Sequence, residues 1–473
     1  MTEALRSAGL KRVRMRVATA VVIMFTLTCA GSFGMEDVVV SSGPGFTLLM
    51  IAVLPWIWSV PMALVSAELG SAVPEAGGLY RWIRRALGEY WSFQAGWWWS
   101  LSLYVDSAVY VALALGYVQT YFDLSSFERW AIGAVIVAAF IYINIRGLDL
   151  TGLSLWIIEA LIIIPYAIFV ALALVKGTGH PFTPFMPEGQ GFMDSLGLGL
   201  SIMMWMYAGY ESMSTLAGEV ENPQRIIPRA LLIDVPLVIA FYFITVVAVI
   251  MAAGEGNWTQ LTSDASTGGI DFVEAAKAVG GGFVGALMFM AAIASNIGLY
   301  TGYLATGSRP AYQMSRDRLF PRFLGKAHPK YGTPWVAILM MGLVNMVLIA
   351  FDFSTLIVID VFLLMFSYIV IYIAAIVLRI REPNLPRPFR VPMPTWLLAV
   401  YTLFPISIAV LALFTNGDDY LVGGLVGVLS GPVAYLVFKY LYHGVKDEAL
   451  EDSVVTPTGE LTEYGAAIEG VAE

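Results

Sequence analysis

The sequence predicts an all-α integral membrane protein. Its 473 residues are 58% hydrophobic and 13% charged, with a mean hydropathy of +0.76. A soluble domain of this size could not bury so much apolar surface. About twelve apolar stretches reach the length of a membrane-spanning helix, roughly 20 residues. A third observation is the uneven distribution of Lys and Arg over the loops between these stretches.

The apolar stretches are separated by short loops rich in proline, glycine and charge, and none of these loops is large enough for a soluble domain. The expected spans cover residues 17–40, 46–70, 91–121, 128–145, 150–175, 191–217, 230–253, 280–308, 334–350, 354–380, 393–414 and 419–441. We therefore expect one membrane domain over 17–441. A basic arm, 1–16, precedes it, and an acidic tail, 442–473, follows, which its composition predicts to be disordered.

The basic residues predict the orientation. With the N-terminus inside, nearly all of the 26 Lys and Arg fall on cytoplasmic loops, and only Arg129, Lys176 and Lys277 fall outside. Both termini are therefore expected in the cytoplasm, and the chain in the plasma membrane. The basic segment 11–16, called the basic lead below, resembles the n-region of a signal peptide. The apolar segment after it is too long and has no small-residue cleavage site, so we expect no cleavable signal peptide. This lead either contacts membrane lipid or only anchors the topology.

The first expected span contains a weakened helix followed by two acids. Gly31, Ser32 and Gly34 precede Glu36 and Asp37, and carboxylates beside a weakened helix are costly in hydrocarbon unless they meet a ligand, a partner or water. Adjacent helical residues point about 100° apart, so at most one acid faces a common cavity unless the helix is unwound. Either one acid binds a substrate ammonium while the other braces the break or takes a proton, or both are solvated at an outer mouth.

Asp106 lies in the middle of the third expected span, far from either interface. Helical spacing places four large side chains on its face, namely Trp99, Leu103, Tyr110 and Leu113. A carboxylate flanked by aromatic rings suits an alkylammonium through ion pairing and cation–π attraction. The alternative is a buried acid that hydrogen-bonds Ser102 or Ser107 for packing alone. The cost of a carboxylate at mid-membrane favours a functional role.

Several segments share a pattern with one group of permeases. The second span ends in AELGSAVPEAGGLYRW (67–82), and the sixth contains WMYAGYE (205–211) followed by SMSTLAGEVENPQR (212–225). The ninth opens with KYGTP (330–334), and RPFRVP (387–392) follows the tenth. Together these segments resemble the amino acid–polyamine–organocation superfamily of permeases. The resemblance extends over all the spans, and the sixth-span block is its most specific part.

Three further segments are similar to the plant-type polyamine/proton symporters of that superfamily: GSFGMED (31–37), FQAGWW (93–98) and VDSAVY (105–110). The resemblance implies a LeuT-like five-plus-five inverted repeat in which the first and sixth spans are broken at the binding site. Two extra helices would follow the repeat. Glycines near the middle of both spans agree with this expectation, because discontinuous helices form such sites.

The resemblance also implies roles for residues of the sixth span. Glu211 follows the Gly209 break and matches a gating acid, and Trp205 falls at the position of an aromatic lid. Tyr207 is a further candidate for the pocket lining. The break itself frees backbone groups that bind solute. The alternative for Trp205 and Tyr207 is packing or interfacial anchoring.

Three other intramembrane polar residues are candidates. Many exchangers of the superfamily carry a lysine three residues before a proline in the fifth span, where this chain has Ile162. This departure argues against lysine-based coupling, so Glu159 either carries the proton or pairs with a neighbouring helix. Asp360 and Glu211 are the other proton-coupling candidates. Asn296 either contacts substrate or bonds another helix.

Charged residues near the helix ends have a simpler expectation. Glu68, Glu219 and Glu221 fall at the cytoplasmic ends of spans, so we expect gating or structural roles in which they pair with basic residues of the inner loops. The basic stretch 316–330 lies between two spans on the positive side, which indicates topology and lipid contact rather than nucleic acid. The single cysteine, Cys29, excludes an intramolecular disulfide and a cysteine metal site.

The sequence therefore predicts a secondary transporter, not an enzyme, with no cofactor and no metal, since P-loop and HExxH motifs are absent. The expected substrate is a cationic amine, either a polyamine or a basic amino acid, imported by proton-coupled alternating access. The acids beside the first break would repel an amino-acid carboxylate. A neutral amino-acid permease or exchanger is the alternative, and a transporter-like sensor is a remote one. An ion channel would need a continuous polar pore.

Overall fold

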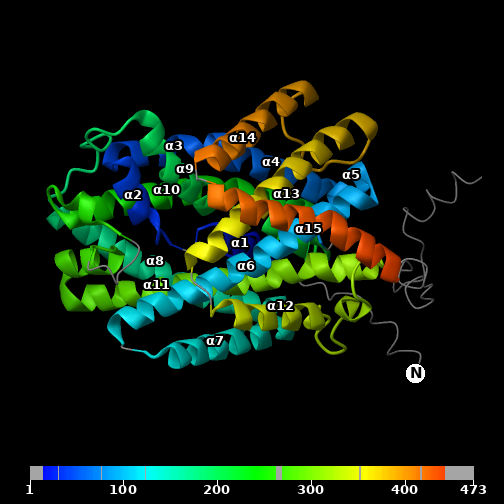
Figure 1. Cartoon of the computed structure of the whole chain (residues 1–473), viewed down its shortest axis with the longest axis horizontal. Coiled ribbons are helices and arrows are strands. Elements are labelled where there is room, and N and C mark those ends of the chain that lie inside the picture. The colour runs from blue at the N-terminus through cyan, green and yellow to red at the C-terminus, as the bar shows by residue number, and fades with distance from the viewer. Residues whose placement is uncertain are drawn as a thin grey trace, which may run out of the picture.

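The computed structural model describes residues 14–29, 31–75, 77–122, 124–262, 269–350, 353–415 and 418–442. Within these ranges the chain is helical apart from loops and an isolated β-bridge between Leu261 and Ile270. Most of the long helices run along the longest axis of the molecule (Figure 1). The predicted all-α class is confirmed. The expected arm and tail fall almost wholly outside the described residues.

Each expected span corresponds to one helix or to a pair of consecutive helices. The pairs, spans one, two and six, are α1 (Val17–Thr28) with α2 (Met35–Ser42), α3 (Pro44–Ile57) with α4 (Ser59–Ala72), and α9 (Phe192–Met206) with the 3₁₀ helix η1 (Ser212–Glu219). The single helices are α6 (Glu89–Tyr121), α7 (Ser126–Arg146), α8 (Leu148–Lys176), α10 (Pro223–Ala253), α11 (Phe272–Arg316), α12 (Trp335–Leu348), α13 (Phe353–Arg381), α14 (Thr395–Thr415) and α15 (Asp418–Tyr442). Among the described residues, short helices also lie between spans: α5 (Leu79–Leu87), η2 (Asn257–Gln260) and η4 (Arg322–Gly325).

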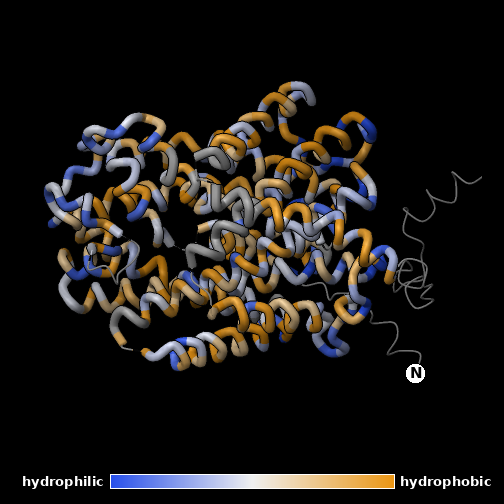
Figure 2. Tube along the Cα trace, viewed as in Figure 1, coloured by the Kyte–Doolittle hydropathy of each residue, from blue (hydrophilic) through white to orange (hydrophobic). Residues whose placement is uncertain are grey.

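The pattern of burial separates interior from peripheral helices. In α6 and α13, 67% of the most apolar window is buried inside the protein, whereas the shares for α7 and α15 are 17% and 11%. Apolar side chains that the protein itself does not cover are typical of lipid-facing helices. Hydrophilic segments gather mainly at the two ends of the long axis, with hydrophobic chain between them (Figure 2). The molecule is therefore built to cross a membrane along this axis.

The two expected helix breaks are present and touch each other. The first separates Thr28 from Met35, and the second follows Met206. Gly209 in the second break has a φ of +100°, and a Cβ there would lie 2.5 Å from the carbonyl oxygen of Leu27. Only glycine adopts this conformation readily while allowing such a close approach. Both predicted broken spans are confirmed.

Two tyrosines hold the ends of the broken helices. The hydroxyl of Tyr242 on α10 lies 3.2 Å from the carbonyl oxygen of Thr28 and 3.0 Å from that of Met206. Tyr303 on α11 donates to the carbonyl of Leu27 at 2.9 Å. The last carbonyls of a helix have no partner within the helix, so such contacts satisfy them. The ends of α1 and α9 are thereby fixed to each other and to the surrounding helices.

One boundary and one short helix differ from the sequence prediction. The eighth span begins at Phe272 rather than near residue 280, because Asp271 accepts a hydrogen bond from the Glu274 N–H at 2.7 Å and caps α11 there. Gly281, with a φ of +75°, is not helical and divides α11 into two helices, so the second of them begins near the predicted residue 280. Lys277 interrupts the apolar pattern, which explains the late start predicted from hydropathy. Helix α5 was not predicted, since nine residues are too few to span a membrane.

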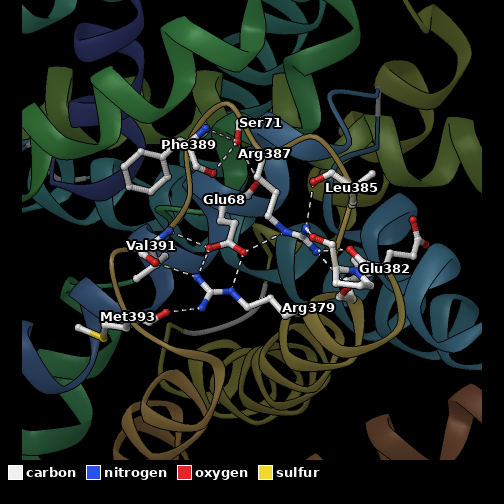
Figure 3. Close-up of polar contacts among 11 residues, drawn as sticks. Glu68, Ser71, Arg379, Glu382, Leu385, Arg387, Phe389, Val391 and Met393 are labelled. Atoms are coloured by element: carbon white, nitrogen blue, oxygen red, sulfur yellow. Dashed lines mark hydrogen bonds and ion pairs between the residues drawn. The ribbon is translucent and has the colours of Figure 1, made fainter.

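Buried ion pairs join the ends of several helices. The Glu68 carboxylate on α4 accepts bonds from Arg379 Nε at 2.7 Å, from a second nitrogen of Arg379 and from the Val391 N–H at 2.8 Å, and Arg387 Nε lies 3.3 Å away (Figure 3). We call these residues the Glu68 cluster. The side chains of Glu68, Arg379 and Arg387 are 4%, 1% and 5% exposed. The expected pairing of Glu68 with basic residues is confirmed.

Glu219 forms a second buried pair at the end of η1. It accepts bonds from Arg309 Nε at 2.7 Å and Arg309 Nη2 at 2.9 Å, and the two side chains are 2% and 1% exposed. This bidentate geometry is typical of strong arginine–carboxylate recognition. Glu219 is thus paired as expected, whereas Glu221 is exposed.

Candidate functional site

Two adjoining cavities lie where the broken helices end. The first, the break cavity, borders the end of α1 and is lined by residues that include Gly31, Phe33, Tyr110, Ser295 and Asn296. The second, the acid cavity, is lined by Ser102, Leu103, Asp106, Trp205, Ala208, Gly209, Glu211, Tyr303, Asp360 and Leu364. Trp205, Ala208 and Tyr303 line both cavities, so the two are adjacent parts of one site.

Three acids converge on the acid cavity. Asp106 comes from α6, Glu211 from the chain after α9, and Asp360 from α13; they are 5%, 1% and 1% exposed. No Lys, Arg or His is among the described residues that line this cavity. Buried carboxylates without cationic partners are costly in their charged form. The arrangement therefore favours a bound cation, protons or both.

Asp106 is held by aromatic donors rather than by serines. Its Oδ2 accepts from the Tyr110 hydroxyl at 3.2 Å, and its Oδ1 accepts from Trp205 Nε1 at 3.2 Å. Ser102 instead contacts Asp360, and Ser107 donates to the Tyr104 carbonyl. The alternative of a serine-bonded packing acid was therefore wrong. The predicted aromatic surroundings of Asp106 are confirmed.

The aromatic rings around Asp106 form a continuous stack. The ring centroid of Tyr110 lies 5.8 Å from that of Trp205, with an angle of 16° between the ring planes. It lies 5.6 Å from the ring centroid of Tyr303, with an angle of 4°. All three rings line the break cavity, and Trp205 and Tyr303 also line the acid cavity. Stacking covers the faces that these rings turn to one another, and the ring surface left in the cavity packs against methylene groups. The stack thus offers a wall along which an alkylammonium chain can lie.

Glu211 is anchored by residues that sequence reasoning did not single out for this acid. Its Oε2 accepts from the Tyr368 hydroxyl at 2.7 Å, and its Oε1 accepts from Trp99 Nε1 at 3.2 Å. The Gly209 N–H in turn donates to the Tyr368 hydroxyl at 3.3 Å. Trp99 was placed on the Asp106 face by helical spacing, but no sequence signal pointed to Tyr368.

Glu36 and Asp37 lie outside both cavities. Glu36 is completely buried and accepts bonds from the Gly34 N–H at 2.8 Å and the Phe272 N–H at 3.3 Å. It therefore braces the first break against the start of α11, and the alternative of a solvated acid at an outer mouth is wrong for it. Asp37 is half-buried on α2. Neither residue is among those that line the break cavity or the acid cavity.

Three further candidates support the breaks from outside the cavities. The Ser32 N–H donates to the Tyr166 hydroxyl at 3.0 Å, and its own hydroxyl pairs with Thr245 at 2.6 Å. Gly34 is the residue before α2. Tyr207 donates to the Ile51 carbonyl at 3.1 Å and does not line either cavity. These residues position the broken helices.

Glu159 lies beside α1, where its Oε1 accepts a bond from the Thr26 hydroxyl at 2.7 Å. It does pair with a neighbouring helix, as one of the two sequence alternatives stated. Asp234 on α10 occupies a similar place, accepting from Thr28 at 2.9 Å. Sequence reasoning missed Asp234, although an acid between Ile233 and Val235 in an apolar span was a visible signal.

Comparisons with known proteins agree with this architecture. A family profile described as "Amino acid permease" matches residues 16–424. The chain is 30% identical to the polyamine transporter RMV1 of Arabidopsis thaliana over 406 residues, which cover 85% of this chain and 81% of that protein. It is 31% identical to the polyamine transporter PUT1 of Oryza sativa subsp. japonica over 411 residues, 83% and 74% of the two chains.

A bacterial relative is also similar over nearly its whole length. The serine/threonine exchanger SteT of Bacillus subtilis is 25% identical over 448 residues, which cover 90% of this chain and 97% of SteT. Profile and relatives together confirm the resemblance that the sequence motifs indicated, including its polyamine-transporter branch. The chain belongs to the amino acid permease family, within the amino acid–polyamine–organocation superfamily.

Proposed function

We propose that the protein is a secondary active transporter that imports a cationic amine, driven by protons, with alternating access to the break and acid cavities. The observation that carries this proposal is that Asp106, Glu211 and Asp360 line one cavity. Among the described residues, no basic side chain lines that cavity. Each ammonium group needs an anion to offset its lost hydration. The polyamine-transporter names of the plant relatives support the same substrate class.

The helix ends at the breaks also favour a cation. The break cavity borders the last residues of α1 and α9, whose terminal carbonyls form the negative ends of their helix dipoles. An amino-acid carboxylate would need the amides at the opposite ends. Two of those amides already have partners, since the Gly34 N–H bonds Glu36 and the Gly209 N–H bonds Tyr368. A substrate without a carboxylate fits this site better.

Exchange of small neutral amino acids is the second candidate, because SteT is similar over 97% of its length. The three acids of the acid cavity argue against it. Protonation of all three acids would be needed before the cavity suited a neutral ligand.

The orientation is part of the proposal. We place both termini in the cytoplasm of a cell whose plasma membrane holds the protein, because the loops with most of the basic residues would then lie inside. In this orientation the Glu68 cluster and the Glu219–Arg309 pair lie toward the cytoplasm. They would close the inner side while the cavities are open to the outside.

The substrate class is tested by competition. We expect putrescine or spermidine to inhibit uptake of a labelled amine in proteoliposomes more strongly than leucine does. A neutral amino acid would leave the acid cavity poorly matched and its own carboxylate repelled. Agmatine and lysine serve as cations of different shape. Tighter binding of leucine than of every cation tested would contradict the polyamine assignment and leave the family membership intact.

The coupling ion is tested with imposed gradients. We expect uptake to rise when the outside is made more acidic than the inside and to fall when a protonophore collapses that gradient. Protons would neutralise buried carboxylates such as Glu211, Asp360 or Glu159 during the cycle. The same vesicles receive a sodium gradient at equal pH as the control. Uptake that follows sodium and ignores the pH gradient would refute proton coupling.

A further inference from the structure

Two buried carboxylates flank the last turn of α1. Glu159 on α8 contacts Thr26, and Asp234 on α10 contacts Thr28. Residues two apart on a helix point about 200° apart, so the acids lie on nearly opposite sides of α1. All four side chains are at most 5% exposed. The pair is separate from the acid cavity, because neither carboxylate lines it.

Each threonine hydroxyl faces two acceptors. Thr26 Oγ1 lies 2.7 Å from Glu159 Oε1 and 2.8 Å from the carbonyl oxygen of Val22. Thr28 Oγ1 lies 2.9 Å from Asp234 Oδ2 and 3.0 Å from the carbonyl oxygen of Met24. A hydroxyl has one proton to donate, and a carbonyl has none. Both contacts of one hydroxyl are therefore full hydrogen bonds only when the carboxyl group is protonated and donates to the threonine.

The second carboxylate oxygen of each acid has no hydrogen-bond partner among the described residues. These atoms are Glu159 Oε2 and Asp234 Oδ1, and both are buried. The titratable groups that face the pair are Cys29, Tyr210 and Tyr242, and none of them supplies a positive charge. Two ionised carboxylates in this position would be expensive, since each would keep an unsolvated oxygen.

We propose that Glu159 and Asp234 form a proton-binding site that controls the last turn of α1 through Thr26 and Thr28. This inference rests on the proton coupling proposed above and adds Asp234 and the two threonines to it. With the site protonated, each acid donates to its threonine, which donates to the helix carbonyl. With the site ionised, each threonine turns its proton to the carboxylate and releases that carbonyl.

The site is connected to the substrate cavity through the chain itself. Thr28, Cys29 and Gly31 line the break cavity, directly after the turn that the acids hold. A change in the hydrogen bond between Asp234 and Thr28 therefore affects residues that line the break cavity. A divalent metal ion held by several carboxylates is a poorer occupant, because no group of three or more His, Cys, Asp or Glu in the described chain could hold one. Calcium, for comparison, takes about six to eight oxygens.

The test separates proton movement from substrate movement. Proteoliposomes containing a pH-sensitive dye receive labelled putrescine, and two rates are measured: proton entry during net uptake, and exchange of labelled for unlabelled putrescine at equal pH. In Glu159→Gln and Asp234→Asn we expect the ratio of the proton-entry rate to the exchange rate to fall at least about tenfold. A tenfold change corresponds to a free-energy difference of about 1.4 kcal/mol. Thermal melting and gel filtration check folding.

Threonine variants test the relay and cover the case in which an acid variant does not fold. Thr26→Val and Thr28→Val keep the shape and lose the hydroxyl, so the same ratio should fall, and Thr26→Ser should recover it. Thr301→Val is the matched control, since Thr301 is equally buried and its hydroxyl donates to the Ile297 carbonyl at 2.7 Å, with no carboxylate as its partner among the described residues. Its ratio should match the wild-type value.

The outcomes distinguish this inference from the proposed function. If the wild type exchanges putrescine but moves no protons, proton coupling is wrong and the inference falls with it. If the wild type moves protons and both acid variants keep its ratio, only the inference is overturned, and the acid cavity carries the proton. If the acid variants lose the ratio and the Val variants keep it, the threonine relay is overturned.

Discussion

Asp106→Asn is expected to reduce uptake of a cationic amine by at least about thirtyfold, the effect of losing about 2 kcal/mol from a buried charge pair. Asparagine has nearly the same shape and keeps one acceptor, but it removes the charge that offsets the ammonium. It also cannot accept from both Tyr110 and Trp205, which bond the two oxygens of Asp106. The measurement is the initial rate of labelled putrescine uptake in proteoliposomes.

Asp194→Asn is the matched control for this variant. Asp194 lies in the first turn of α9, the helix that carries Trp205, and it is exposed and outside both cavities. The same chemical change should therefore leave uptake within about twofold of the wild type, since surface substitutions usually alter stability by less than about 0.5 kcal/mol. Wild-type uptake by Asp106→Asn at normal protein levels would remove Asp106 from the site.

Glu68→Ala is expected to lower the free energy of unfolding by about 3–5 kcal/mol, because it leaves Arg379 and Arg387 buried without their anion. Both guanidinium groups are at most 5% exposed. The Val391 N–H would lose its acceptor as well (Figure 3). Thermal unfolding of the detergent-solubilised protein measures the effect as a lowered midpoint.

Glu382→Ala serves as the control, because it breaks an arginine–glutamate pair that is only partly buried. Glu382 bonds Arg85 Nη2 at 2.6 Å, but the two side chains are 33% and 25% exposed. A solvent-exposed pair contributes about 0–1 kcal/mol, so its loss should shift the midpoint little. Equal shifts of the unfolding midpoint for the two variants would show that burial does not increase the contribution of the Glu68 cluster to stability.

Hydropathy and charge predicted most of the architecture. The apolar stretches correspond to the helices because the bilayer imposes a minimum length on any spanning segment. The breaks in the first and sixth spans were implied by the resemblance to the permease superfamily, and glycines such as Gly31 and Gly209 supplied the local backbone freedom that agrees with them. Helical spacing predicted Tyr110 beside Asp106, whereas Trp205 and Tyr303 come from other helices.

Other features depend on contacts between distant segments. Thr28 and Asp234 are 206 residues apart in the chain, and Glu211 and Tyr368 are 157 apart. No periodicity within one helix indicates which residue of another helix it will meet. For this reason Asp234 and Tyr368 were missed as partners. Glu36 was expected near the substrate because its place in the sequence is close to the break.

The sequence by itself determined the class and the spans, because length and hydropathy act locally along the chain, and its resemblance to a permease superfamily implied the broken helices. It also supplied the acids, since a carboxylate in an apolar span is costly wherever the helix packs. Only the tertiary structure decided which acids share a cavity. Asp106, Glu211 and Asp360 line one cavity between packed helices. Both carboxylate oxygens of Glu36 instead accept backbone N–H bonds that brace the first break. Helix packing sets these distances, and it depends on the shapes of all the facing side chains at once.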